Sequence, residues 1–252
     1  MKRALALLGG MTALLCAGHA QAFELGTREQ KGGQYQGGYH TAQNFALEIR
    51  VSPYYPKVDD EPGLTGSPFK KNFGDSARVY VGLEFDWQVW RIPGVGTIGP
   101  GFMLGRVSMS RDARTVTGRV SGDSYSLTIY PMYLAAVLRI DTLWRNFGVP
   151  LMPYGKAGPA IAFWSADNAT GTSTANGVKG SGKSLGTDVA LGVTFPLDFF
   201  DSGASRGMDS TTGINTTSLY FEYYMLGLNG FGSNDTLRVG TNTWSAGMTF
   251  EF

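Results

Sequence analysis

The chain has 252 residues, with 21 Lys and Arg against 20 Asp and Glu, and a single Cys. This balance of charge leaves no basic excess, which argues against a nucleic-acid-binding protein. A single Cys excludes a fold held by internal disulfides. Glycine is abundant and 13% of the residues are aromatic, a composition that suits an all-β chain.

The first 22 residues predict a cleaved secretory signal peptide. A charged start is followed by an apolar run over 4–17 and an Ala-Gln-Ala cleavage site at 20–22. The run is shorter than the roughly 20 apolar residues of a membrane-spanning helix. Leu15 before Cys16 does not fit lipoprotein processing. No long apolar run follows, so any membrane contact must come through strands.

Residues 23–44 are rich in Gly and Gln without periodicity, and we expect a loosely ordered N-terminal arm there. From 45 to 252, alternation of apolar and polar residues predicts eight strands that form one barrel. The predicted strands span about 45–52, 77–89, 98–110, 125–137, 151–164, 185–199, 219–225 and 244–252. The register of 98–110 and 151–164 stays open, because their patterns are weak.

The connections support a membrane barrel of antiparallel strands. Long polar loops follow every odd strand, at about 53–75, 111–122, 165–184 and 227–240, and short turns at 91–96 and 141–149 follow the second and fourth strands. Long outer loops that alternate with short periplasmic turns are typical of outer-membrane barrels, with both termini periplasmic. The long connector 201–215 breaks this rule, and a short helix at the rim would reconcile it. Pro131 lies inside a predicted strand, where we expect a bulge or a kink.

The final strand carries an unbroken pattern. Trp244 to Phe252 alternates without a slip, and the chain stops on an aromatic residue. We expect this strand to pair with the strand beginning near Phe45, which would close the barrel and hide both edges. The ending resembles the C-terminal signal of Gram-negative outer-membrane barrels. The residues predicted to form this assembly signal are Trp244, Met248, Phe250 and Phe252.

Alternation alone does not say which face is inside, since a soluble ligand-binding barrel buries its apolar face. The apolar faces are rich in Leu, Val and Phe without charges, and we expect them to face lipid. On 125–137 this face comprises Tyr125, Leu127, Ile129, Tyr133, Ala135 and Val137. Aromatic residues near the strand ends predict interfacial belts; the alternative is ordinary core packing. The belt residues are Trp87, Trp90, Trp144, Trp164 and Phe199.

The opposite faces carry charged residues, which the barrel would enclose. Ions in a narrow, dry lumen must pair, because burying an unpaired charge costs several kcal/mol. We therefore predict a mixed-charge plug; the alternative is that several of these groups stay hydrated at wide barrel ends. The predicted lumen network comprises Glu48, Arg50, Arg78, Glu84, Asp86, Lys156, Asp188, Glu222 and Glu251.

Motifs that resemble catalytic or binding sequences lack the context that their chemistry needs. Residues 177–184 match the phosphate-loop pattern, but a loop precedes them and a strand follows, so no helix start can cradle phosphate. Residues 94–99 match G-x-G-x-x-G and predict a hairpin turn. His40 lies in the arm, and the acidic run 59–61 is a solvated loop tip. We predict no catalytic, cofactor or metal site.

The order of several stretches resembles a family of small outer-membrane β-barrel proteins of myxobacteria and related Gram-negative bacteria. The matching stretches are 49–54 before an acidic Pro-rich loop, 133–142, 150–158 and 195–200. The resemblance implies a location and an architecture, with no activity.

We therefore expect a non-enzymatic outer-membrane protein with a structural or interaction role. Its expected partners are outer-membrane lipid, the barrel-assembly machinery and periplasmic chaperones. The ligand stays open, and the alternatives are a small pore, a lipid-modifying enzyme or a soluble periplasmic barrel.

Overall fold

A computed structural model describes residues 44–114, 119–175, 177–200, 202–233 and 236–252. The predicted signal peptide, nearly all of the predicted arm, and His40 lie outside these residues. Within the described parts of the chain, no helix has the length and apolar character needed to cross a membrane.

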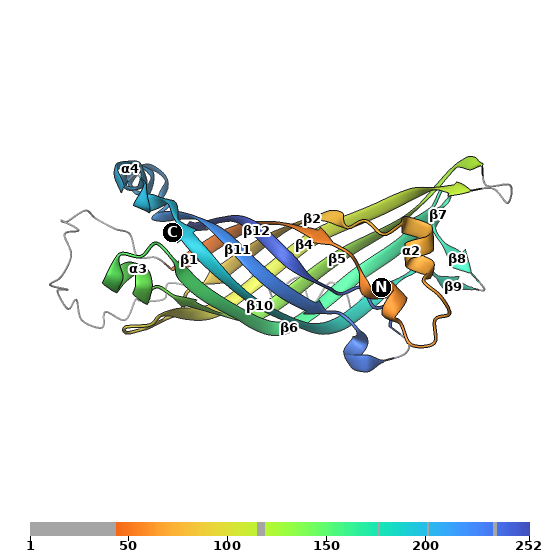
Figure 1. Cartoon of the computed structure of the whole chain (residues 1–252), viewed down its shortest axis with the longest axis horizontal. Coiled ribbons are helices and arrows are strands. Elements are labelled where there is room, and N and C mark those ends of the chain that lie inside the picture. Colours follow the sequence, from red (N-terminus) through yellow and green to blue (C-terminus); the bar gives the residue numbers. More distant parts are fainter. Residues whose placement is uncertain (1–43, 115–118, 176, 201, 234–235) are drawn as a thin grey trace, which may run out of the picture. The chain divides into compact units, whose positions relative to one another are not determined.

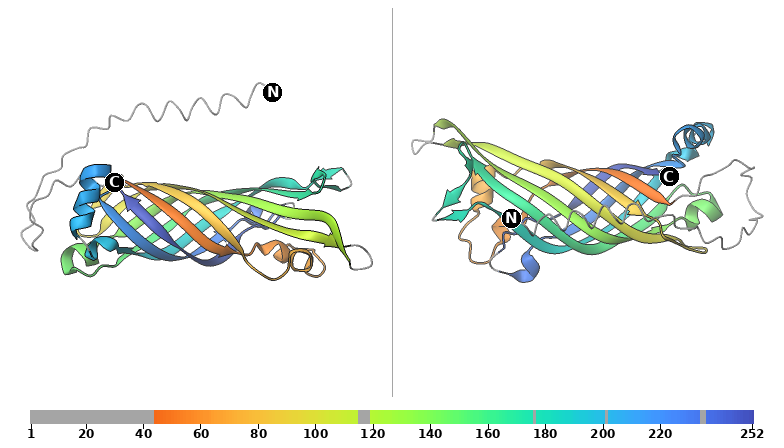
Figure 2. Two further views of the ribbon diagram at one scale, coloured as in Figure 1. Left: turned by 90° about the horizontal axis from the view of Figure 1, so that it is seen from above. Right: turned by 180° about the vertical axis from the view of Figure 1, so that it is seen from behind.

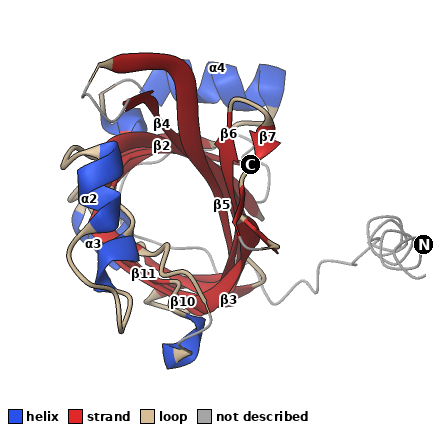
Figure 3. Ribbon diagram, turned by 90° about the vertical axis from the view of Figure 1, so that its right-hand side faces the viewer, coloured by secondary structure: helices blue, strands red, loops and turns tan. Residues whose placement is uncertain are grey.

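Eight long antiparallel strands form a closed barrel (Figures 1 and 3). Each strand pairs with its neighbours along the chain, and β10 pairs with β6 across three short strands. The last strand pairs with the first, from Ala46 with Glu251 to Val51 with Ala246, so the predicted closure is confirmed. The strands are β1 (Phe45–Tyr54), β2 (Arg78–Trp87), β4 (Gly96–Arg114), β5 (Val120–Ile140), β6 (Met152–Asn168), β10 (Ser181–Pro196), β11 (Thr216–Gly227) and β12 (Thr241–Glu251).

The remaining elements lie at the two ends of this barrel (Figure 1). The end that carries the C-terminus, here called the C-terminal end, holds β3 (Trp90–Ile92), α3 (Thr142–Phe147), η2 (Leu197–Phe199) and α4 (Ser202–Thr212). The opposite loop end holds η1 (Lys57–Asp60), α2 (Pro68–Phe73), β7 (Gly171–Thr172), β8 (Thr174–Ala175), β9 (Val178–Lys179) and η3 (Gly230–Gly232). Helix α4 lies in the connector 201–215, where a short helix was predicted.

The β4–β5 hairpin is longer than the sequence suggested. The predicted loop 111–122 is largely strand, because pairing continues to Arg114 and Val120. Figure 2 shows this yellow-green hairpin at the end of the barrel opposite the C-terminus. Polar residues dominate this segment, so the alternation that would reveal strands is absent although the backbone still pairs.

Of the bulge or kink predicted at Pro131, the register excludes the bulge. Leu104 pairs with Met132 and Val107 pairs with Ile129, so the offset between β4 and β5 is the same on both sides of the proline. No pair joins the strands between these positions, where the proline has no amide to donate. On its other side Pro131 stays in register with Ala162 of β6. The strand therefore accommodates the proline by losing local pairing.

The loop between β1 and β2 is held by hydrogen bonds and an ion pair among its own residues. The Asp59 carboxylate accepts the backbone N–H groups of Phe69 at 2.7 Å and Lys70 at 2.9 Å, which satisfies the start of α2. Lys70 also pairs with Asp75 at 2.6 Å, and this hydrogen bond raises the pKa of Lys70. The acidic run 59–61 thus includes a helix cap, a role that the sequence analysis did not foresee.

Candidate functional site

The half of the lumen nearer the C-terminal end is filled by charged side chains. They occupy alternate positions on their strands, so the pleat turns each of them inward and the intervening apolar residues outward. On β1, Glu48 and Arg50 are fully buried between partly or fully exposed neighbours. The buried charged residues of the barrel are Glu48, Arg50, Glu84, Asp86, Arg139, Lys156, Asp188, Glu222 and Glu251.

Lys156 lies at the centre of this charged layer. Its Nζ is 2.6 Å from Glu48 Oε2 and 2.8 Å from Glu84 Oε2. Glu222 Oε2 is 3.8 Å away. One ammonium group therefore joins carboxylates from three strands, β1, β2 and β11. Removing it would leave these buried carboxylates facing one another.

Two arginines extend the network on either side. The Arg139 guanidinium binds Glu48 at 2.5 Å and also Asp86. Arg50 Nη2 is 2.5 Å from Glu222 Oε1 and 3.1 Å from Glu84 Oε2. Each of these carboxylates except Asp86 thus has two basic partners, and the ion pairs cross-link strands on opposite parts of the wall.

Tyrosines add hydrogen bonds to two of the acids. Tyr133 donates to Glu84 Oε2 at 2.5 Å, and Tyr154 donates to Glu222 Oε2 at 2.9 Å. Gly192 makes room for this arrangement, because a Cβ there would lie 2.5 Å from the Tyr154 ring. The guanidinium of Arg50 lies 5.5 Å from the centre of the Tyr133 ring, within the range of cation–π attraction.

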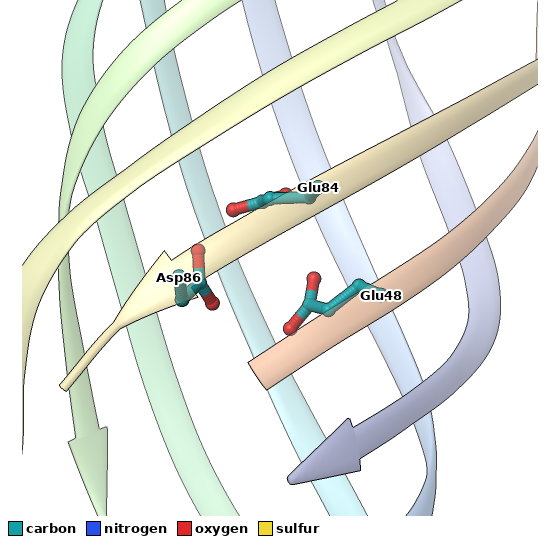
Figure 4. Close-up of side chains that lie close together, drawn as sticks. All are labelled: Glu48, Glu84 and Asp86. Atoms are coloured by element: carbon teal, nitrogen blue, oxygen red, sulfur yellow. The ribbon is translucent and has the colours of Figure 1, made fainter. Parts of the chain in front are cut away.

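Three carboxylates of this layer lie close enough to suggest a metal site. Oxygens of Glu48, Glu84 and Asp86, from the neighbouring strands β1 and β2, lie within 4.8 Å of one another (Figure 4). Arg139 bridges Glu48 and Asp86, while Lys156 bridges Glu48 and Glu84. Protein cations therefore already take the positions between these oxygens, and the cluster gives no support for a bound metal.

The structure places the other predicted lumen residues differently. Asp188 is fully buried, and neither of its carboxylate oxygens has a hydrogen-bond partner among the described residues. Glu251 accepts a 3.4 Å hydrogen bond from Gln88. Arg78 lies apart from the network at the loop end, where it donates to the carbonyls of Ser76 and Phe73. Its inclusion was wrong because that strand position lies beyond the charged layer.

Arg139 was missed by the sequence reasoning. The predicted strand ended at 137, whereas β5 continues to Ile140. The signal that could have identified it is its place two residues after Val137, on the same face of the strand. Tyr133 and Tyr154 were also not predicted to face the lumen, because an aromatic side chain on a strand of a membrane barrel can equally well face lipid.

The half of the lumen nearer the loop end is apolar, here called the apolar layer. The prediction that the face of β5 with Leu127, Ile129 and Tyr133 meets lipid is wrong, because these side chains are buried inside. Tyr80 packs where Gly105 leaves space, since a Cβ on Gly105 would lie 2.2 Å from the Tyr80 hydroxyl. The layer comprises Tyr54, Tyr80, Met103, Val107, Met109, Leu127, Ile129, Ala162, Leu226 and Val239.

The predicted belt residues lie mainly at the C-terminal end. Trp87 and Trp90 are exposed, and Trp144 of α3 packs edge-on against Phe199 with ring centres 6.4 Å apart. Trp164 differs from the prediction: it packs against the apolar layer, and it meets the lumen-facing Gly182. A tryptophan near a strand end is predicted from sequence to be a belt residue. Trp164, however, occupies a position of β6 whose side chains point inward.

The C-terminal strand lies in the wall with its apolar residues outward. Trp244 is exposed and stacks on Phe221 of β11, with ring centres 4.9 Å apart. Met248 is also exposed, while Phe250 is half-buried and, with Met208 of α4, lines a hollow of the wall. Phe252 is bonded to the first strand through the backbone of Phe45. The four residues of the predicted assembly signal therefore lie on the outer side of β12 or at its end.

The two sequence motifs lie in strands and turns. Residues 93–95 form the turn between β3 and β4, and residues 96–99 already belong to β4, so only the start of the motif 94–99 lies in the predicted hairpin turn. Residues 181–184 belong to β10, and Lys183 pairs with Phe163 of β6. The part of 177–184 that the structure describes therefore contains no helix start that could cradle phosphate.

The outer wall and the lumen have the reverse polarity of a soluble barrel. Leu191, Val79 and Phe221 are 70%, 69% and 50% exposed, whereas Glu48 and Glu84 are 0% exposed. In water, exposing this apolar wall would cost about 25 cal/mol of free energy per Å² of apolar surface. Contact with lipid removes that cost. The chain is a membrane-spanning β-barrel. Its exposed apolar band is the surface that contacts lipid.

No protein-family model matches this chain, and no curated protein matches it. Its fold is similar to that of Ail, the attachment invasion locus protein of Yersinia pestis, solved with the heparin analogue sucrose octasulfate. The identity is 11%, the match covers 83% of this chain and 97% of that one, and the TM-score is 0.40.

Two further solved structures are similar at the same level. For the N-terminal β-barrel domain of Pseudomonas aeruginosa OprF the identity is 13%, the coverage is 83% and 98%, and the TM-score is 0.38. For the outer membrane protease OmpT of Escherichia coli the identity is 8%, the match covers 83% of this chain and 94% of that one, and the TM-score is 0.34. None of these sources is a myxobacterium, so the resemblance to a myxobacterial family finds no support there. The barrel assignment rests on the closed sheet and the exposed apolar wall of this chain.

Proposed function

We propose that this chain is an integral outer-membrane protein with a structural or interaction role, closed to the passage of solutes. The observation that carries the proposal is the filled lumen. The charged layer crosses the barrel with side chains bonded from wall to wall, and the apolar layer fills the remaining length. An interior of about eight strands is only wide enough for side chains to fill.

The proposal places the C-terminal end in the periplasm and the loop end outside the cell. Short connections at one end and long loops at the other support this orientation. A cleaved signal peptide would direct export, periplasmic chaperones would accompany the unfolded chain, and the barrel-assembly machinery would read Trp244, Met248, Phe250 and Phe252. The loops around α2 and η3 would then be available for contacts outside the cell.

Fractionation and gel mobility test the membrane assignment. The protein should be recovered in the outer-membrane fraction and should shift in mobility on SDS gels when boiled. Recovery in the soluble periplasmic extract would contradict the proposal.

Planar-bilayer recording then tests the closed lumen. The wild-type barrel should give no steady conductance. The heat-induced gel shift of the protein recovered from the bilayer-forming vesicles is the control that the barrel is folded and inserted. A steady current through the wild-type barrel would favour a pore.

The alternative that the protein is a lipid-modifying enzyme predicts phospholipid hydrolysis that the His40→Ala variant loses. We expect no such hydrolysis by the wild-type protein.

A further inference from the structure

The outer wall changes from apolar to polar at a definite position on several strands. On β4 the outward side chains Phe102 and Leu104 are exposed and apolar, and the next outward residue towards the loop end is Arg106. On β10 the outward Leu185 is followed towards the loop end by Lys183. On both strands a basic side chain is therefore the first polar group beyond the apolar band.

Two aromatic side chains lie between these basic groups. Tyr130 of β5 pairs with Phe163 of β6, and Phe163 pairs with Lys183 of β10. The Arg106 guanidinium lies 5.9 Å from the centre of the Tyr130 ring. All four side chains are exposed on the same outer wall, one on each of four adjacent strands. We call Arg106, Tyr130, Phe163 and Lys183 the basic–aromatic row.

The row lies at the border of the apolar band. Outward positions one step nearer the loop end are polar on three of these strands: Ser108, Ser165 and Ser181. Outward positions one step nearer the C-terminal end are apolar: Leu104, Met132, Ile161 and Leu185. Tyrosine and other aromatic residues favour this depth, where one end of the ring meets headgroups.

The two basic groups of the row have no acidic partner. Among the described residues, neither Arg106 nor Lys183 forms an ion pair, whereas Arg91 and Arg145 at the C-terminal end both bind Asp141 at 2.7 Å. Arg91 and Arg145 on the C-terminal side of the band are therefore neutralised by Asp141, whereas Arg106 and Lys183 at its other border are left available to an external anion.

We infer that the basic–aromatic row binds the phosphate groups of an anionic lipid in the leaflet at the loop end. The inference rests on the proposed function, because it requires the wall to lie in a membrane. Arg106 and Lys183 supply the charge, and guanidinium groups bind phosphate with paired N–H donors. Tyr130 and Phe163 supply the apolar surface against which the upper part of an acyl chain packs.

A binding titration tests the inference. The purified barrel in detergent micelles is titrated with diphosphorylated lipid A, and lipid-bound species are counted by native mass spectrometry. The R106Q/K183Q variant should bind this lipid more weakly, by about fivefold for each basic side chain removed. The matched control R91Q/R145Q, which removes two paired basic groups at the other rim, should bind like the wild type. Dephosphorylated lipid A should bind the wild type and R106Q/K183Q equally.

Equal affinity of the wild type and R106Q/K183Q for the phosphorylated lipid would overturn the inference, as would an equal loss in R91Q/R145Q. The heat-induced gel shift is recorded for every variant, so that a variant that fails to fold is recognised. In that case the single variants R106Q and K183Q are measured instead, with the same expectation for each. A wild-type chain that shows no gel shift at all would refute the membrane assignment, which is a separate outcome.

Discussion

The charged layer and the apolar layer fill the same lumen by different physical means. In the charged layer, Lys156, Arg139 and Arg50 join acids from several strands, and each group depends on its partners to offset the cost of leaving water. In the apolar layer, Met103, Ile129 and their neighbours are held by packing, which has no fixed partner. The two layers should therefore respond differently to mutation.

The comparison also explains where tyrosine is used. Tyr133 is part of the apolar cluster, yet its hydroxyl donates to Glu84 of the charged layer. Tyr224 likewise belongs to the apolar cluster, and its hydroxyl bonds the Ser52 hydroxyl at 2.8 Å. A residue with an apolar ring and a polar tip suits the border between the layers.

The largest effect should come from removing the central cation. Lys156→Met leaves Glu48 and Glu84 buried without their shared partner, and we expect it to lower the free energy of unfolding by about 3–5 kcal/mol. Urea titration of the barrel refolded in lipid vesicles measures this change. Lys70→Met, which breaks the exposed pair with Asp75, is the control and should leave stability unchanged. A loss for Lys156→Met no larger than for this control would mean that the charged layer does not support the fold.

A smaller effect should follow from crowding the charged layer. Gly192→Ala places a Cβ 2.5 Å from the Tyr154 ring, so the ring must move away from Glu222. We expect a loss of about 1–3 kcal/mol, as is usual for overpacking, measured by the same urea titration. The double variant with Tyr154→Phe should not recover the loss, because the ring carbon that clashes is still present, whereas Tyr154→Ala should relieve the clash with the ring and leave only the 2.7 Å contact with Glu222 Cβ. An unchanged midpoint for Gly192→Ala would show that the ring has room.

The smallest effect should come from the apolar layer. Ile129→Val removes one buried methylene, and we expect a loss of about 0.5–1.5 kcal/mol. Fluorescence-monitored unfolding in vesicles resolves this difference. Since packing has no fixed partner, Ile129→Leu should cost no more than about 1.5 kcal/mol. If either variant were as harmful as Lys156→Met, the contrast between the layers would fail.

Much of the fold follows from alternation in the sequence. The eight long strands, the closure by the last strand and the inward position of Glu48, Arg50, Glu84 and Glu222 were all predictable, because a strand has only two faces and charged residues marked one of them. Strands with weak patterns were harder. In β4 the inward positions include Gly101 and Gly105, which leave space for Asp86 and Tyr80, and glycine carries no hydropathy signal.

The sequence by itself determined that the chain alternates in long strands, that those strands carry charges on one face, and that the last strand could close a barrel. Only the tertiary structure decided that the apolar face of β5 turns inward, that Trp164 faces the lumen and that Arg139 and Lys156 share Glu48. The physical reason is that alternation distinguishes two faces of a strand without ordering them. Which face is enclosed, and which groups meet across the lumen, depends on the register of each strand with its neighbours.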